Sequence, residues 1–120
     1  MTDDLERTVL DYLAAVARGD RAAAWLLLSD EARDWYRYSA PEGIKPADHH
    51  FEDITRAWPS TIDAAREGRA VLYNTTISDD GMSGETIVVA NPEPVDDEQT
   101  IAGLLTRIGC RRTGPGWGVG

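Results

Sequence analysis

Three side chains of this sequence combine acid–base chemistry with positions from which they could act on a small molecule. Tyr12 lies on an otherwise apolar stretch, where its hydroxyl can donate a hydrogen bond to a carbonyl or enolate oxygen. Asp34 stands among aromatic residues, an environment that suits a general base. His50 borders an apolar stripe and can exchange protons near neutral pH. We expect Tyr12 to be a hydrogen-bond donor or acid, with Asp34 or His50 as the base.

Each of these residues also has a purely structural interpretation. Tyr12 could be a core residue whose hydroxyl bonds the backbone, and Asp34 could lie at a solvated sheet edge. His50 could be half-buried without any catalytic task. His49 and Asp53, four residues apart, lack the third protein ligand of a zinc site, so we expect a surface ion pair there and no metal. We expect no cofactor either.

The residues that would position Tyr12 follow a helical spacing. Apolar side chains recur at i, i+4, i+7, i+8 and i+11, which is one face of an α-helix: Leu5, Val9, Tyr12, Leu13 and Val16. Gly19 can end this helix in the left-handed conformation that glycine adopts without strain. Asp20 can then cap a second helix over residues 21–28, which carries Trp25, and Ser29 can cap a third, short turn.

The segment 34–38 is predicted to be a short strand, because its aromatic residues are frequent in strands and residues 41–43 follow as a turn. Alternate residues of a strand share a face, so this prediction groups three side chains: Asp34, Tyr36 and Tyr38. Another helix is expected from Pro46 to Trp58, and one more helical piece over residues 60–67.

From residue 69 onward the sequence is typical of strands and turns. Strands are expected at residues 71–77, 86–90, 100–111 and 117–119, with a hairpin at Asp80-Gly81 and a solvated connection over residues 91–99. Helices followed by an antiparallel meander predict one α+β domain over residues 1–120. A bent sheet around helices leaves a hollow for a ligand, and we expect four aromatic residues to line it: Trp25, Tyr36, Trp58 and Tyr73. The tryptophans could equally be packing residues of the core.

Composition excludes several classes of partner. The formal net charge of −9 over 120 residues disfavours nucleic acid and anionic membranes, because both attract positive patches. The single cysteine, Cys110, excludes an intramolecular disulfide and a thiolate zinc site. No apolar run approaches the roughly 20 residues that cross a bilayer. We therefore expect a cytoplasmic protein.

Two N-terminal segments resemble a known family. Residues 12–20 (YLAAVARGD) and 24–32 (AWLLLSDEA) look like the opening of the NTF2-like α+β cone fold, and residues 114–119 (GPGWGV) are similar to its closing hairpin. That superfamily includes ketosteroid isomerases, SnoaL-type cyclases, limonene-epoxide hydrolase-like enzymes and non-catalytic binding domains. The resemblance implies that Tyr12 matches the tyrosine that bonds the substrate's carbonyl oxygen in the isomerases. The position of their catalytic aspartate falls on Tyr36, which is a departure from the isomerase pattern.

Two hypotheses for function follow. The leading one is a protein that binds a small apolar organic molecule and, if it is an enzyme, catalyses cofactor-free cyclisation, isomerisation or dehydration. The alternative is a non-catalytic NTF2-like binding or dimerisation module. Apolar residues on both faces of the predicted strand 100–111, among them Leu105, support the alternative, because an apolar outer sheet face needs a cover. The partner expected there is a second copy, giving a homodimer through the sheet face.

Overall fold

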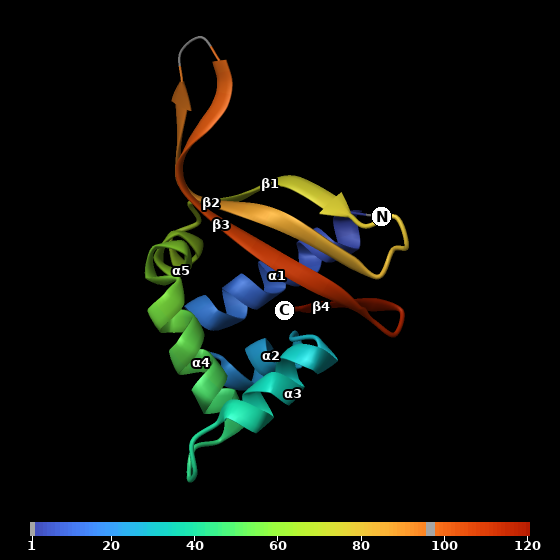
Figure 1. Ribbon diagram of the computed structural model, residues 1–120. Helices are drawn as coiled ribbons and strands as arrows, with labels where there is room; N and C mark the ends of the chain where they lie inside the picture. Colours follow the sequence, from blue (N-terminus) through green and yellow to red (C-terminus); the bar gives the residue numbers. More distant parts are fainter. Residues whose placement is uncertain (1, 96–97) are drawn as a thin grey trace.

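Helices fill the first half of the chain and strands the second half. The computed structural model of the protein describes the backbone of residues 2–95 and 98–120. It describes the side chains of residues 2–90 and 105–120. The helices are α1 (Thr2–Ala17), α2 (Arg21–Leu26), α3 (Asp30–Ser39), α4 (Pro46–Ala57) and α5 (Pro59–Arg66). The strands are β1 (Ala70–Ile77), β2 (Ser83–Val95), β3 (Glu98–Thr113) and β4 (Gly116–Val119). The predicted α+β class is confirmed (Figure 1).

The predicted start and stop signals of the first helices are confirmed. α1 buries the apolar face expected for it, and Gly19 follows it with a φ of 78°. The Asp20 side chain caps α2 by accepting a hydrogen bond from the Ala23 amide at 3.1 Å, and Ser29 caps α3 through the Ala32 amide, also at 3.1 Å. Local capping chemistry therefore sets where these helices begin.

The segment 34–38 is helical, so its prediction as a strand is wrong. It belongs to α3, whose N-terminal cap is followed by acidic residues that suit the positive end of a helix dipole. Helical spacing places Tyr36 alone on the buried side of α3, while Asp34 and Tyr38 are exposed. The shared face expected for these three side chains does not exist, because residues i and i+2 of a helix point in different directions.

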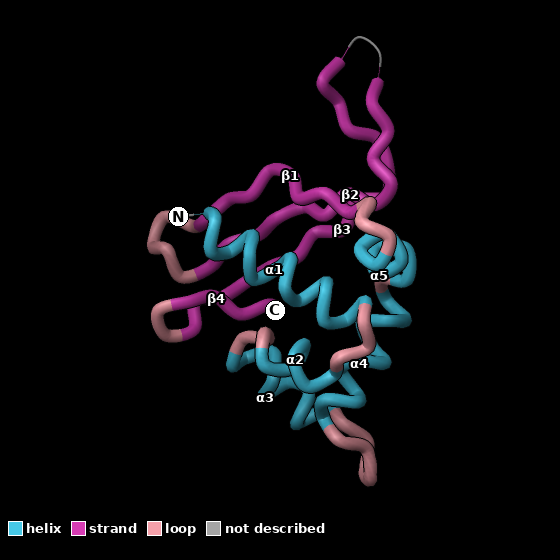
Figure 2. Tube along the Cα trace, turned by 180° about the vertical axis from the view of Figure 1, so that it is seen from behind, coloured by secondary structure: helices cyan, strands magenta, loops and turns pink. Residues whose placement is uncertain are grey.

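The strands form one antiparallel sheet in the order β1-β2-β3-β4. Figures 1 and 2 show the sheet with α1 lying across one face. Apolar residues of this inner face, including Val88, Ile108 and Val119, belong to the same buried core as the apolar side of α1. The solvated connection predicted over residues 91–99 is wrong for most of its length, because β2 and β3 continue to pair beyond a register shift at Ala90. Asp96 and Asp97 lie outside the described residues.

A short parallel contact ties the helical layer to the edge of the sheet. The Ser29 amide donates to the Val119 carbonyl at 2.8 Å, and the Val119 amide donates to the Leu27 carbonyl at the same distance. Gly118 permits this contact, because a Cβ there would lie 2.5 Å from the Ser29 Cα and 2.6 Å from its amide nitrogen. The start of α3 is thus fixed against β4. None of the described helices is both long and apolar enough to cross a membrane.

Candidate functional site

Tyr12 and His50 meet in the interior of the protein. The Tyr12 hydroxyl lies 2.6 Å from the His50 Nε2 atom, and both side chains are 0% exposed. Tyr12 comes from the apolar face of α1, and His50 comes from the buried side of α4, next to Ile54 one turn further on. Either group can be the donor, depending on the imidazole tautomer. Two of the three predicted acid–base residues are therefore hydrogen-bonded partners.

Aromatic rings from three helices surround the His50 imidazole. The ring centroid of Tyr36 lies 5.0 Å away in an edge-on arrangement, that of Tyr12 lies 5.7 Å away, and that of Trp25 lies 6.3 Å away. The Tyr36 hydroxyl donates to the Asp53 carboxylate at 2.7 Å. Within the described residues, the His50 Nδ1 atom is buried without a hydrogen-bond partner. We call Tyr12, Trp25, Tyr36, His50 and Asp53 the aromatic cluster.

Burial decides the charge states in this cluster. Desolvation lowers the pKa of His50 from 6.5 to about 4; the Asp53 carboxylate partly opposes this change and His49 adds to it. Desolvation also raises the pKa of Tyr12 and of Tyr36, and nearby Asp53 raises both further. At neutral pH the imidazole is therefore uncharged and both phenols keep their protons, so the phenols act as hydrogen-bond donors and not as bases.

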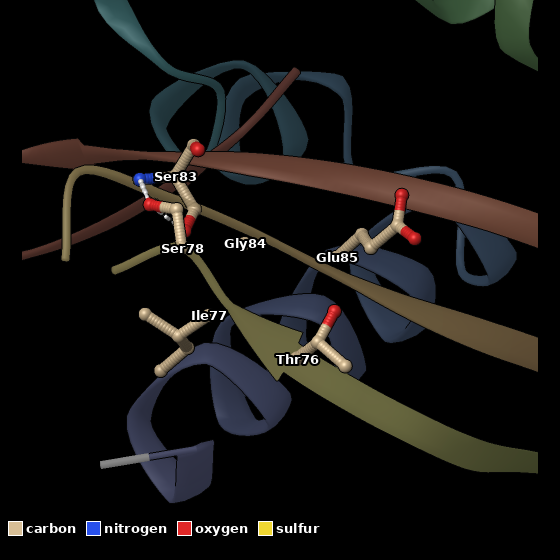
Figure 3. Close-up of a pocket in the computed structure, with 6 residues that line it drawn as sticks. All are labelled: Thr76, Ile77, Ser78, Ser83, Gly84 and Glu85. Atoms are coloured by element: carbon tan, nitrogen blue, oxygen red, sulfur yellow. Dashed lines mark hydrogen bonds between the residues drawn. The ribbon is translucent and has the colours of Figure 1, made fainter. Parts of the chain in front are cut away.

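The Tyr12 phenol is enclosed, with the rings of Tyr36 and Trp25 packed around its partner His50. Pockets found over the described residues lie elsewhere. The one in Figure 3 has a volume of about 260 Å³ and lies at the β1–β2 hairpin, between residues 76–78 and 83–85. There the Ser78 hydroxyl bonds the Ser83 backbone, and no acid–base residue of the predicted site takes part. The Tyr12 phenol is thus closed off from solvent in this structure.

The other predicted site residues are dispersed. Asp34 is on the exposed side of α3 and pairs with Arg37 at 3.0 Å, so the premise that placed it beside Tyr36 is wrong. Trp58 is half-buried at the junction of α4 and α5, next to a groove that also includes Leu105. Tyr73 lies on β1 and is 48% exposed. Of the predicted ligand-binding residues, the structure brings only Trp25 and Tyr36 to the Tyr12–His50 pair.

Asp53 is the member of the aromatic cluster that sequence reasoning assigned elsewhere. It was expected to form a surface ion pair with His49, but its carboxylate accepts the Tyr36 hydroxyl instead. Its position three residues after His50 on one helix is the signal that could have placed it near the imidazole. Among the described residues, no three His, Cys, Asp or Glu side chains gather closely enough to hold a metal ion.

Comparison with known proteins adds a distant likeness. No family model and no curated protein matches this chain. Among solved structures, it is similar to an NTF2-like family protein from Streptomyces avermitilis that carries a provisional assignment as a dehydratase. The two chains share 15% identity over 98% of this chain and 90% of that chain, with a TM-score of 0.49. At that distance the activity of the Streptomyces protein is not transferred to this one.

Proposed function

We propose that this protein is a non-catalytic interaction module, which pairs with a second copy through the outer face of its sheet. The observation that carries this proposal is an apolar patch on the sheet face opposite α1. Val71, Val89 and Leu105 are register partners across three strands, and Tyr73 pairs with Ile87 in a neighbouring row. Val71 is 42% exposed and Leu105 is 62% exposed, whereas Val89 between them is covered. An exposed apolar patch of this kind marks an interaction surface.

The charges around this patch favour a second copy as the partner. The whole chain carries −9, so most approaches of two copies are repulsive. On the outer sheet face, Glu85 and Arg107 lie 3.6 Å apart, and Arg111 follows Arg107 on the same side of β3. The described side chains of this face therefore carry both signs of charge, which a self-complementary contact requires. Two copies related by a twofold axis can oppose Arg107 of one to Glu85 of the other while covering the patch.

Replacing Leu105 by aspartate tests this function. The wild-type protein is expected to sediment as a dimer, and Leu105→Asp should raise the dissociation constant about 100-fold, because a charge would be buried at the centre of the interface. Leu26→Asp is the matched control, since Leu26 is 71% exposed on α2, away from the sheet. Circular dichroism should be unchanged in both variants. A wild-type protein that remains monomeric at high concentration would contradict the proposal.

A second candidate function is favoured by the Tyr12–His50 hydrogen bond. Buried ionisable groups with displaced pKa values gather at functional sites, and a buried imidazole nitrogen without a partner invites a ligand. In this candidate, a small apolar molecule with a carbonyl oxygen displaces Tyr36, accepts the Tyr12 hydroxyl and offers a proton to neutral His50. Cofactor-free isomerisation, cyclisation or dehydration would follow from that geometry. The order of helices and strands supports placing the chain in the NTF2-like family.

Tyr12→Phe tests the second candidate. The variant leaves the His50 Nε2 atom buried without its partner, so we expect a loss of about 1–3 kcal/mol in unfolding free energy. Thermal stabilisation by any apolar ketone that raises the melting temperature of the wild type should also disappear. Tyr38→Phe is the control, because Tyr38 is 81% exposed. Equal stabilisation of wild type and Tyr12→Phe by such a ketone would exclude Tyr12 as its ligand.

A further inference from the structure

α3 is attached to the rest of the protein at two points. Its N-terminal end is fixed by Ser29, which caps the helix and bonds β4. Beyond that end, Tyr36 is its one buried residue among those described, and α4 is its main packing partner. Near its C-terminal end, the Ser39 hydroxyl is buried with no partner within the described residues, which lowers the cost of exposing that end. The N-terminal end of α3 is therefore firmly held and can act as a hinge, whereas its C-terminal end is weakly held.

Apart from Ala32, which packs on the core near the start of the helix, and Arg37, which lies over the Trp25 ring, the second attachment consists of groups around one tyrosine. The Tyr36 hydroxyl bonds Asp53, and its ring packs edge-on against both His49 and His50. All three of these partners lie on α4. The titratable and charged groups near the His50 imidazole come from three helices: Tyr12, Tyr36, Arg37, His49 and Asp53. Arg37 reaches the cluster only through Trp25, with its guanidinium 5.6 Å from that ring.

We infer that α3 is an acid-sensitive latch, which swings away from α4 about Ser29 when the buried His50 imidazole takes up a proton. The closed cluster offers the charged imidazole no direct carboxylate partner, because Asp53 is engaged by Tyr36. Removing the Tyr36 ring lets water reach the imidazole, so the open form binds the proton more tightly than the closed form. Opening uncovers the Tyr12–His50 pair while α1 and the sheet keep their contacts.

Hydrogen exchange of the wild-type protein at pH 7 and pH 4.5 tests the latch. The pKa of His50 is about 4 in the closed form and near 6.5 when the ring is solvated. Linkage then raises the opening equilibrium of α3 by up to about 60-fold between these pH values. After correction for intrinsic exchange rates, amides of α3 should be less protected than amides of α1 at both pH values, and their exchange should depend only weakly on urea concentration, because opening of α3 exposes less surface than global unfolding. Equal protection and equal urea dependence in the two helices would mean that α3 opens only by global unfolding, and would overturn the proposal.

Three substitutions on α4 identify the responsible group. His50→Gln keeps a hydrogen-bonding side chain without a titration in this range, so the acid response of α3 should vanish. His49→Gln should leave the response intact. Asp53→Asn retains an acceptor for Tyr36 and should also leave it intact; a response abolished by Asp53→Asn alone would identify the carboxylate as the switch and refute the role of His50. Should His50→Gln fail to fold, the comparison of α3 with α1 in the wild type still decides the matter.

Discussion

Gly118→Ala is expected to lower the free energy of unfolding by about 3 kcal/mol or more, a large share of the total stability of a domain of this size. The added Cβ would lie 2.5 Å from the Ser29 Cα, 2.6 Å from its amide nitrogen and 2.9 Å from the Leu28 carbonyl carbon. All three are backbone atoms, which cannot rotate away. The two hydrogen bonds between residues 27–29 and Val119 must therefore lengthen or break.

Gly109→Ala is the matched control for this prediction. Gly109 lies on the neighbouring strand β3, and a Cβ there meets no atom within 4 Å among the described residues. Urea denaturation of both variants measures the difference, since stability falls linearly with denaturant. We expect Gly109→Ala to be neutral or slightly stabilising, because alanine restricts the unfolded chain. If the two variants were equally stable, the close contact of β4 with Ser29 would not exist in solution.

The second large effect is a loss of stability on mild acidification. The unfolded chain protonates His50 with a pKa near 6.5, whereas the folded protein holds the ring neutral down to about pH 4. Between these values the unfolded state binds more protons, so stability is complete above pH 6.5 and falls as the pH is lowered. By pH 4 the loss amounts to about 3 kcal/mol. Chemical denaturation at a series of pH values measures it.

Two comparisons assign this loss to His50. In His50→Gln the stability should be nearly constant between pH 7 and about pH 4.5, whereas His49→Gln should keep the wild-type profile. The carboxyl groups of Asp20 and Asp80 affect the free energy of unfolding only at lower pH. Backbone and side-chain hydrogen bonds hold their pKa values below 3.8, so their stabilisation is present above that value and is lost as the pH falls through their folded pKa values. A wild-type profile that is flat down to pH 4.5 would show that His50 is solvated.

The helix boundaries near the N-terminus could be predicted because their causes are local. The Asp20 and Ser29 caps and the positive φ of Gly19 involve residues within a few positions of one another. The aromatic composition of the segment 34–38 alone predicts a strand, because aromatic residues are frequent in strands. The cap at Ser29 and the ion pair between Asp34 and Arg37 extend the helix through it. The helix cap at Ser29, upstream of the segment, therefore outweighs the strand preference of its aromatic residues.

The sequence also indicated most residues of the aromatic cluster, but it did not indicate how they contact one another. Periodicity placed Tyr12 and His50 on the apolar sides of two helices, and the structure buries both. It could not show that they bond each other, because 38 positions separate them and only the packing of α4 against the α1–α2 pair brings them together. Nor could it show that Tyr36 and Trp25 would occupy the hollow expected beside the phenol.

The sequence by itself therefore determined the α+β class, the helix caps, the hairpin and the apolar character of both sheet faces. Each of these depends on the spacing or chemistry of residues close together in the chain. The tertiary structure alone decided that the Tyr12–His50 pair is closed, that Asp53 accepts a hydrogen bond from Tyr36, and that Val71 and Leu105 on the outer sheet face stay exposed while Val89 between them is covered. The packing of side chains in the core and the register of the strands arise from contacts between segments that are distant in the sequence. A local sequence pattern does not predict such contacts.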